Sequence, residues 1–543
     1  MRYFPDESTD RPWTRYAVAA LPLLYLIVAL AYSTYLAPWG RQVDPESAYA
    51  MNGLAWAAGY PMIKNDHPGT TTILLGGLTI KLYAFLSGRS DIIEFGLENY
   101  DAFIYASRAA EALLLSLALL ASGLMVRRAT RSAIAAVLFQ VAPFVHYEGL
   151  HFASMLTPES LMVTFVILGT GLVLKSALGR EPPTAGLGIA QGLVFALGLS
   201  SKYLYAPLAI LSVGLLRSWR AYVLATLVGA FGFFVFNRIL NPYVFTSGFR
   251  WLVNLATHKG VYGEGEPGFI DFNLFWSNMA QITAASPLIS AVFALGTCVA
   301  LARMLTSRNY RDPVSLTLLA CGIAFAAQLV ATSKHFSLHY MVASWTLTGG
   351  VLVLTIIEMR RLWPATSPRL LSGAAGLICI VLIATSLIEA RREAVAWTGL
   401  NKIGARLSAA VVSAAPTCAN VSAMFVRAPE NELNHGGDMT LATPAMEARF
   451  SEAYARAFKA PLLDHNFYRN VLLRNFLVHS YAQLAGEYPC IVVRTSRELN
   501  ARTSSGLLEL RPDHCRVEDI HVYTVGLACG RIQDAYMSKS FPG

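Results

Sequence analysis

Long apolar segments recur through the first 390 residues of the chain. A bilayer core of about 30 Å needs about 20 apolar residues per helix, and eleven segments approach or reach that length. Of all residues 55% are hydrophobic and 14% are charged, whereas a soluble chain carries about a quarter charged residues. The sequence therefore predicts a polytopic α-helical membrane protein. The predicted spans are 16–38, 104–126, 132–145, 160–174, 185–199, 203–216, 221–237, 282–302, 313–332, 340–357 and 370–388.

Basic residues in the short turns indicate the orientation of these spans. If residues 185–216 form two helices and the N-terminus is cytoplasmic, every short basic turn lies on the cytoplasmic side, as the positive-inside rule requires. If they form one helix, the last three basic groups move to the other side. We therefore predict eleven spans, with the C-terminus outside the cytoplasm. The basic residues are Arg127, Arg128, Arg131, Lys175, Arg180, Arg217, Arg220, Arg303, Arg308, Arg311, Arg360, Arg361 and Arg369.

The end of the chain, residues 391–543, has an ordinary soluble composition and is long enough to form its own core. Helical spacing over 445–458 and strand patterns at 420–426, 490–495 and 520–525 predict an α/β domain. The predicted domains are a membrane domain at 1–390, with outer loops 39–102 and 239–281, and an exported domain at 391–543.

Four of the seven cysteines lie in the predicted exported domain. An even number of cysteines in such a domain permits two disulfides. Among three connectivities we favour Cys418 with Cys490 and Cys515 with Cys529; free buried thiols are the alternative.

Charged and polar residues gather on the face opposite the cytoplasmic turns. Basic side chains there oppose the positive-inside bias, so an anionic partner is the simplest explanation for them. Just after the first span comes Asp44-Pro45-Glu46, the leading catalytic candidate. The binding candidates are Lys64, Asp66, His67, Arg108, Glu159, Lys202, His258, Lys334, His339 and Tyr340.

The order of several short motifs resembles the GT-C superfamily of membrane glycosyltransferases, nearest to protein O-mannosyltransferases and the bacterial aminoarabinose transferase of lipid A. The resemblance extends from about residue 15 to residue 360, and the C-terminal domain matches only in its position. Many relatives have two adjacent acids, whereas Pro45 separates them here, so Asp44 is the firmer assignment. The motifs are Asp44-Pro45-Glu46, His67-Pro68, Arg108, Thr157-Pro158-Glu159, Ser201-Lys202-Tyr203 and His339-Tyr340.

This resemblance implies sugar transfer outside the cytoplasm, from a polyprenyl-phosphate-linked donor to a lipid, glycan or protein acceptor, in a bacterial inner membrane. Asp44 is the candidate base that takes the proton of the acceptor hydroxyl, and inversion at the anomeric carbon follows. The leaving phosphate needs charge-assisted donors. The candidate donors are His67, Arg108, Lys202, Lys334 and His339. From its position, we expect the exported domain to bind the acceptor or to cover the active site.

Each candidate has a structural alternative. Asp44 can cap the helix that starts near Glu46, and Glu46 can stabilise the N-terminus of that helix. Arg108 can pair with Glu111, Lys202 can extend to the membrane interface, and the histidines can make structural hydrogen bonds. The carboxylates of Asp44 and Glu46 suit Mg²⁺ or Mn²⁺, but two ligands define no unique site, so we predict no tightly held metal.

Two other functions are weaker fits. The net charge of +9 is explained by cytoplasmic arginines and lipid headgroups rather than by nucleic acid. A transporter or flippase of a lipid-linked sugar also needs many spans and phosphate contacts. Transporters, however, tend to place charges near the bilayer midplane and to contain repeated halves, and the sequence has neither feature.

Overall fold

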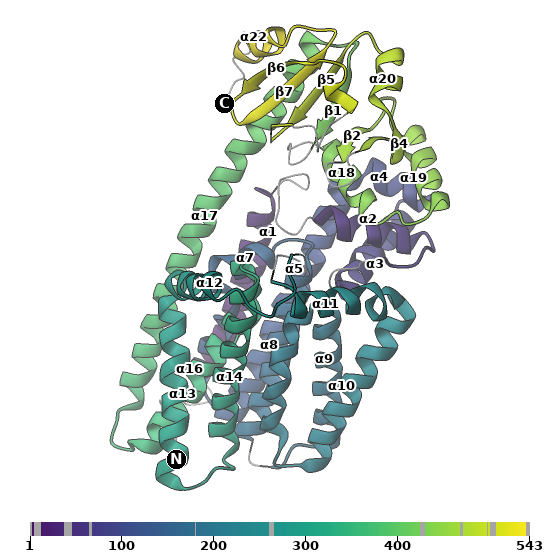
Figure 1. The fold of residues 1–543 in the computed structure, drawn as a ribbon. Coiled ribbons are helices and arrows are strands. Elements are labelled where there is room, and N and C mark those ends of the chain that lie inside the picture. The colour runs from purple at the N-terminus through teal and green to yellow at the C-terminus, as the bar shows by residue number, and fades with distance from the viewer. Residues whose placement is uncertain are drawn as a thin grey trace. The chain divides into compact units, whose positions relative to one another are not determined.

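The computed structural model contains mostly helices, with one β-sheet close to the C-terminus (Figure 1). The chain divides into two compact units, which we call the membrane unit and the sheet unit. The membrane unit comprises Met1–Tyr32, Lys64–Thr72 and Arg108–Arg391, and the sheet unit comprises Ser33–Ile63, Ile73–Ser107 and Arg392–Gly543. The structure describes residues 3–4, 12–36, 46–63, 68–179, 181–259, 265–423, 429–466, 471–496, 498–499 and 506–538.

Seven helices of the described residues are long and apolar enough to cross a membrane, and a bent helix pair adds an eighth candidate. Three predicted spans, at 132–145, 185–199 and 203–216, correspond to shorter apolar helices. The number eleven therefore stays a prediction. The helices are α1 (Pro12–Ser33), α5 (Tyr100–Thr130), α6 (Ala133–Gln140), η1 (Ala142–Phe144), α7 (Tyr147–Phe152), α8 (Pro158–Leu178), α9 (Ala185–Ser201), η2 (Tyr203–Leu215), α10 (Trp219–Leu240), η3 (Pro242–Phe245), α11 (Ser247–Thr257), α12 (Phe272–Ala285), α13 (Pro287–Ser307), α14 (Pro313–Lys334), η5 (Leu338–Met341), α15 (Val342–Trp345), α16 (Thr348–Leu362) and α17 (Pro368–Ala414).

The region 185–216, on which the predicted topology depends, forms two helices. Helix α9 ends at Ser201, and η2 begins at Tyr203 and packs against it. Lys202 between them has an extended backbone, with φ −152° and ψ 140°. The break that the positive-inside argument required is therefore present.

The long helices expose many apolar side chains among the residues that the structure describes. Only 17% of the apolar window of α10 is buried, and Leu227, Phe231 and Phe234 on this helix are exposed. A soluble protein rarely exposes so large an apolar patch, whereas lipid covers it at no cost. The protein is therefore a multi-pass membrane protein.

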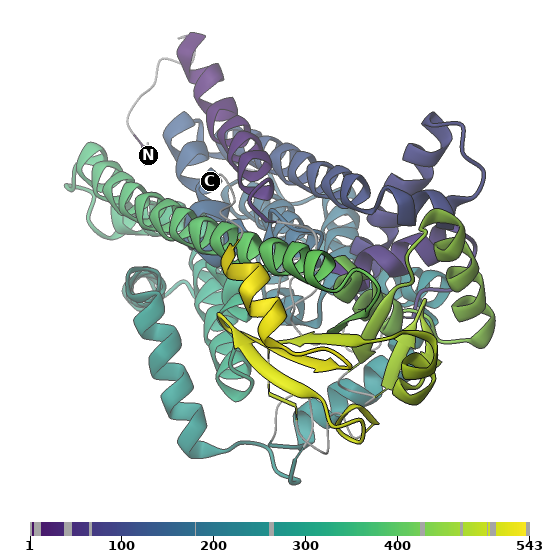
Figure 2. The same ribbon diagram turned by 90° about the horizontal axis from the view of Figure 1, so that it is seen from above.

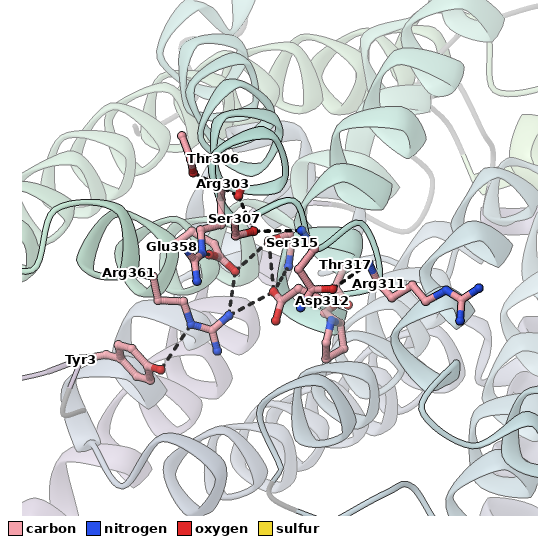
Figure 3. Close-up of polar contacts among 12 residues, drawn as sticks. Tyr3, Arg303, Thr306, Ser307, Arg311, Asp312, Ser315, Thr317, Glu358 and Arg361 are labelled. Carbon is pink, nitrogen blue, oxygen red and sulfur yellow. Dashed lines mark hydrogen bonds and ion pairs between the residues drawn. The ribbon is translucent and has the colours of Figure 1, made fainter.

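A buried polar cluster joins α13, α14 and α16 (Figure 3). Glu358 on α16 is fully buried, and its carboxylate accepts a hydrogen bond from Ser315 Oγ at 3.1 Å. It pairs with Arg361 Nη1 at 3.0 Å and with Arg303 Nε at 3.7 Å. Arg361 Nη1 also pairs with Asp312 at 3.0 Å. The charge of Glu358 is thus matched by basic groups from two helices.

Asp312 forms the N-cap of α14 and accepts a hydrogen bond from the backbone N–H of Ser315 at 2.9 Å. Burial alone would raise the pKa of Asp312, but this bond and the charge of Arg361 lower the pKa below its usual value. The cap therefore stays ionised and links the start of α14 to α16.

We expect Arg361→Met to destabilise the membrane unit by about 3 kcal/mol, because removal of one partner of a buried ion pair leaves the other charge uncompensated. Arg311→Met is the matched control, since Arg311 is exposed beside the same cluster, and it should change stability by less than about 0.5 kcal/mol. Unfolding in mixed detergent micelles measures both. Equal midpoints for the two variants would contradict a stabilising role for the cluster.

The sheet unit contains a seven-stranded sheet in the order β4-β3-β2-β1-β5-β7-β6. The central strand β1 is parallel to β2 and β5, and the other neighbours are antiparallel. The elements are α2 (Glu46–Ala57), α3 (Thr70–Leu86), α4 (Ile92–Glu98), β1 (Ala419–Ala423), α18 (Pro429–Asp438), α19 (Pro444–Ala457), β2 (Leu463–Asn466), β3 (Val471–Arg474), β4 (Leu477–His479), α20 (Tyr481–Glu487), β5 (Ile491–Thr495), β6 (Asp513–Val517), β7 (Ile520–Val525) and α22 (Gly530–Ser538).

Both faces of the sheet are covered, which confirms the predicted α/β character of the C-terminal part. Val421 and Val493 pack on one face with Leu484 of α20. On the other face, Leu407 in the last turns of α17 and Ile532 of α22 complete a second core. The ribbons of the long green α17 and the yellow α22 can be followed beside the sheet in Figure 2. Strand β5 is buried along its whole length, as expected for a central strand with both faces covered.

Two disulfides brace the sheet. Cys418 and Cys490, immediately before β1 and β5, are joined with their Cα atoms 4.5 Å apart, and Cys515 in β6 is joined to Cys529 with a Cα separation of 5.8 Å. These are the two pairings favoured from the sequence.

The first outer loop packs with the C-terminal residues. Helix α2 lies against α18 and α4 lies against α19, so residues 33–63 and 73–107 belong to the sheet unit. The assignment of the loop 39–102 to the membrane domain stays a prediction, and nothing local in the chain signals contacts to segments more than 300 residues away.

Ion pairs fasten α4 to α19. Arg449 Nη2 lies 2.7 Å and Arg456 Nη2 lies 2.9 Å from Asp91 Oδ2, while Arg456 Nε lies 2.7 Å from Glu94 Oε2. Burial alone would raise the pKa of Asp91, but the hydrogen bond from Arg449, the Glu94 backbone N–H and the two positive charges lower it. The arginines thus favour the ionised carboxylate.

Because the folded pKa of Asp91 lies below its unfolded value of about 3.9, its contribution to stability is full at neutral pH and is lost as the pH falls through the folded pKa. We expect Asp91→Asn to lower the Tm of the sheet unit at pH 7 by about 2 °C, with the difference from wild type disappearing as the pH falls below the folded pKa of Asp91. Glu98→Gln is the control, because Glu98 pairs only locally with Arg89 at 2.9 Å. A pH-independent difference would refute the ionic mechanism.

Candidate active site

Four of the predicted site residues, Asp44, Lys64, Asp66 and His67, lie outside the described residues. Glu46 is the first residue of α2 and is 1% exposed. It lies in the first turn, where a negative charge is stabilised by the helix dipole, so the structural role considered for Glu46 fits its position.

Glu159, Lys202 and His339 form a buried cluster within the membrane unit. Lys202 Nζ makes an ion pair with Glu159 Oε1, and His339 Nε2 lies 3.7 Å from the same oxygen. Glu159 is 0% exposed, Lys202 is 4% exposed and His339 is 2% exposed. The Lys202 ammonium also lies 5.0 Å from the centre of the Tyr340 ring, within the range of a cation–π contact. The structure thus brings together four predicted site residues from three separate segments.

Local sequence explains why these side chains converge. Thr157 is the N-cap of α8 and Pro158 occupies its first turn, a favoured position for proline because no backbone hydrogen bond is lost there. Glu159 follows at the positive end of the helix dipole. Lys202 is the C-cap of α9, where the dipole favours a cation. Two helix ends therefore present opposite charges to one another.

His339 is oriented by its neighbours. Its Nδ1 lies 2.6 Å from Ser337 Oγ, and its ring packs at a centroid distance of 4.7 Å from Phe152. The backbone carbonyl of Tyr340 accepts a hydrogen bond from Gln328 Nε2 at 2.6 Å. These contacts direct Nε2 of His339 toward Glu159. Sequence reasoning had not selected Ser337, Phe152 or Gln328, because they carry no signature without the fold.

The second carboxylate oxygen of Glu159 is buried and has no hydrogen-bond partner among the residues that the structure describes. Buried polar atoms in folded proteins are nearly all hydrogen-bonded, so such an oxygen requires an explanation. A hydroxyl or amide of a bound molecule would satisfy it. The cluster therefore has the character of a binding site as well as that of a structural ion pair.

The chain that directly follows His67 is fixed beside Lys202. Gly69 N donates to the carbonyl of Ser201 at 2.9 Å, and the hydroxyls of Thr71 and Ser201 lie 2.6 Å apart. Gly69 has a φ of 57°, a left-handed conformation that glycine adopts without strain. The residue next to Ser201 is Lys202. The segment Pro68–Thr72 thus lies at the edge of the Glu159–Lys202 cluster.

Two asparagines hold the same segment from α10. Asn237 Oδ1 accepts from Thr70 Oγ1 at 2.6 Å, and Asn241 Nδ2 donates to the carbonyl of Pro68 at 3.0 Å. Asn237, Asn241 and Thr70 are fully buried. These bonds anchor the segment at Pro68 and at Thr70.

Arg108 lies on α5 and is 1% exposed, and Glu111, three residues further along the helix, is fully buried. Buried charges require partners. Two partners were predicted for Arg108, a phosphate and the Glu111 carboxylate. Both pairings stay predictions.

His258 is the C-cap of α11, and Lys334, the last residue of α14, contacts the same end of α11. Lys334 Nζ donates to the carbonyl of Ala256 at 2.8 Å, and His258 Nδ1 lies 3.1 Å from Thr257 Oγ1. The neighbouring His335 Nε2 lies 3.1 Å from the carbonyl of Leu255. Basic groups commonly stabilise the last carbonyls of a helix. A structural role accounts for the position of Lys334, and its role in phosphate binding stays a prediction.

We expect Lys202→Met to destabilise the membrane unit by about 3–5 kcal/mol, because it leaves Glu159 buried without its main partner. The double variant Lys202→Met/Glu159→Gln should recover most of this loss, since it removes both charges. Unfolding midpoints in mixed micelles test the pair without reference to any activity. If the double variant lost as much stability as the two single variants together, the two charges would not be coupled.

No protein-family model matches the sequence, and no curated protein matches it. The fold is similar to the crystal structure of ArnT from Cupriavidus metallidurans bound to undecaprenyl phosphate, with 13% identity, a TM-score of 0.47 and coverage of 93% of this chain and 98% of that chain. It is also similar to the Archaeoglobus fulgidus oligosaccharyltransferase tethered to an acceptor peptide, with 12% identity, a TM-score of 0.38 and coverage of 87% and 68% of the respective chains.

Proposed function

We propose that this protein is a GT-C-type membrane glycosyltransferase that transfers a sugar from a polyprenyl-phosphate donor to a lipid, glycan or protein acceptor outside the cytoplasm. The observation that carries the proposal is the buried cluster of Glu159, Lys202 and His339 beside the segment that follows His67. Three motifs that are distant in sequence, and that resemble those of the superfamily, meet there.

In the proposed reaction, Asp44 accepts the proton of the acceptor hydroxyl as its oxygen attacks the anomeric carbon of the sugar. A bond forms between that oxygen and the anomeric carbon while the bond from the carbon to the donor phosphate breaks. The electron pair of the broken bond leaves with the polyprenyl phosphate. Attack opposite the leaving group inverts the anomeric configuration.

The basic residues stabilise the phosphate as it leaves. We assign Lys202 and His339 to this role, together with His67 and Arg108, because donors in a water-poor site stabilise developing negative charge strongly. Glu159 holds the Lys202 ammonium in place, and its second oxygen accepts a hydroxyl of the bound sugar or acceptor. The polyprenyl tail lies among apolar helices in a bacterial inner membrane, and the N-terminus is cytoplasmic.

No tightly held metal is part of the proposal. Among the residues that the structure describes, no three histidines, cysteines or acids are grouped so as to hold a metal ion, and Asp44 lies outside those residues. Mg²⁺ or Mn²⁺ bound by Asp44 and Glu46 remains an alternative that a chelator tests. Activity lost on chelation and restored by one divalent ion would overturn the metal-free mechanism.

The first test is the release of polyprenyl phosphate when purified protein is given a panel of polyprenyl-phosphate sugars and membrane extract. We expect Asp44→Asn to lower the rate by about 10²–10⁴-fold, the usual effect of losing a general base. Glu266→Gln is the control, because its side chain is 87% exposed in an outer loop, and it should keep the wild-type rate.

The outcome also separates the two classes of function. Sugar transferred to an acceptor by wild type but not by Asp44→Asn supports the transferase. If neither protein transfers sugar, and the intact lipid-linked sugar instead crosses a vesicle bilayer, the transporter replaces it.

A further inference from the structure

Helix α2 connects, along the chain, the two motifs that carry Asp44 and His67 in the proposed mechanism. It begins at Glu46, two residues after Asp44, and the chain returns from it to Ile63, the residue before Lys64. All its side chains except Trp56 are buried. The orientation of α2 therefore affects both the acidic motif and the segment that ends in His67-Pro68.

The first turn of α2 is bonded to the C-terminal part of the chain. Ser47 Oγ donates a hydrogen bond to Glu432 Oε2 of α18 at 2.9 Å, and the two residues are 385 positions apart. Ser47 is fully buried and Glu432 is 8% exposed. Loss of a buried hydrogen bond leaves its partner unsatisfied at a cost in free energy, so this contact helps to fix the start of the helix.

The backbones of α2 and α18 also approach closely. A Cβ atom at Gly436 would lie 2.6 Å from the carbonyl oxygen of Ser47 and 2.7 Å from Met51 Cγ. Since the nearest obstacle is backbone, any side chain at position 436 would push the two helices apart. Gly436 therefore fixes the distance between α18 and the first turns of α2.

Asn52 extends the same connection to the other end of the loop. Its Oδ1 accepts a hydrogen bond from the backbone N–H of Ile63 at 3.0 Å, and its Nδ2 approaches Thr440 Oγ1 at 3.5 Å. Asn52 is fully buried. One side chain thus links α2, Ile63 and the residues that follow α18.

We propose that residues 429–440, inserted between strands β1 and β2, position α2 for catalysis, with Glu432 and Gly436 as positioning residues for Asp44. This inference rests on the proposed function for its catalytic consequence, and on the contacts alone for its structural part. It assigns the C-terminal domain a role in holding the catalytic base, distinct from binding the acceptor or covering the site.

A matched contact in the same unit separates positioning from general stability. Arg456 of α19 pairs with Asp91 and Glu94 of α4, so it also joins the C-terminal residues to the loop that contains α2. It does so through α4, which packs against α2, and not through the first turn of α2. Arg456→Ala should therefore loosen the unit while leaving the bond between Ser47 and Glu432 in place. Glu432→Gln is the conservative variant, because its amide oxygen still accepts from Ser47.

The experiment compares wild type, Glu432→Ala, Glu432→Gln, Ser47→Ala and Arg456→Ala as full-length detergent-solubilised proteins. The first readout is amide hydrogen exchange of residues 46–57. We expect exchange to be about tenfold faster in Glu432→Ala and Ser47→Ala, as loss of a buried hydrogen bond predicts, and close to wild type in Glu432→Gln and Arg456→Ala.

The second readout is kcat and KM for the donor. A misplaced base lowers kcat while donor binding is kept, so we expect kcat to fall about tenfold in Glu432→Ala, with KM within about twofold of wild type. The double variant Ser47→Ala/Glu432→Ala should be no slower than the slower single variant, since both act through one bond.

Normal exchange and normal kcat in folded Glu432→Ala would overturn the inference, and so would an equal loss of kcat in Arg456→Ala. If wild type transfers no sugar, the proposed function fails, and the exchange data alone then decide whether residues 429–440 hold α2. Unchanged exchange in Glu432→Ala and Ser47→Ala would reject that role.

Discussion

The free-energy cost of burying charged groups in an apolar environment constrains which side chains can lie inside the membrane unit and what they must contact. A charged side chain within a bilayer is tolerated where it is paired or where it faces a binding site. Glu159 and Glu358 are both fully buried, and each is paired with at least one basic group from another helix. The two clusters differ in one respect. The charge of Glu358 is balanced by two arginines from two helices, whereas the charge of Glu159 is balanced mainly by one lysine at the C-terminal end of α9.

The sequence was informative wherever local physics decides the structure. Hydropathy located the spanning helices, the arginine-rich turns required the break at Lys202, and the strand patterns identified β1, β5 and β7. Glu159, Lys202 and His339 were selected because each stood near the outer end of a predicted span. That Lys202 and His339 both approach one oxygen of Glu159 was not predictable from any one motif, since it depends on how α8, α9 and η5 pack.

The sequence was least informative about contacts between its two ends. Asp91 and Arg456, or Ser47 and Glu432, are paired across more than 360 positions. Such pairs leave no periodicity or characteristic spacing in a single sequence, because the two partners lie on separate helices that are far apart in the chain. For this reason the outer loop and the exported domain were expected to be separate parts, although they share one compact unit.

The shared unit has a consequence for how the protein is made. A ribosome adds about 5–20 residues per second, so the 385 positions between Ser47 and Glu432 correspond to about 20–80 s of translation. During that time α2 and α4 have been made, while the helices α18 and α19 that pack against them do not yet exist. The two ends of the chain meet only after the last span has been inserted. On the proposed function, a nascent or truncated chain would therefore carry the acidic motif without the support that holds it, and the reaction would begin only when synthesis is complete.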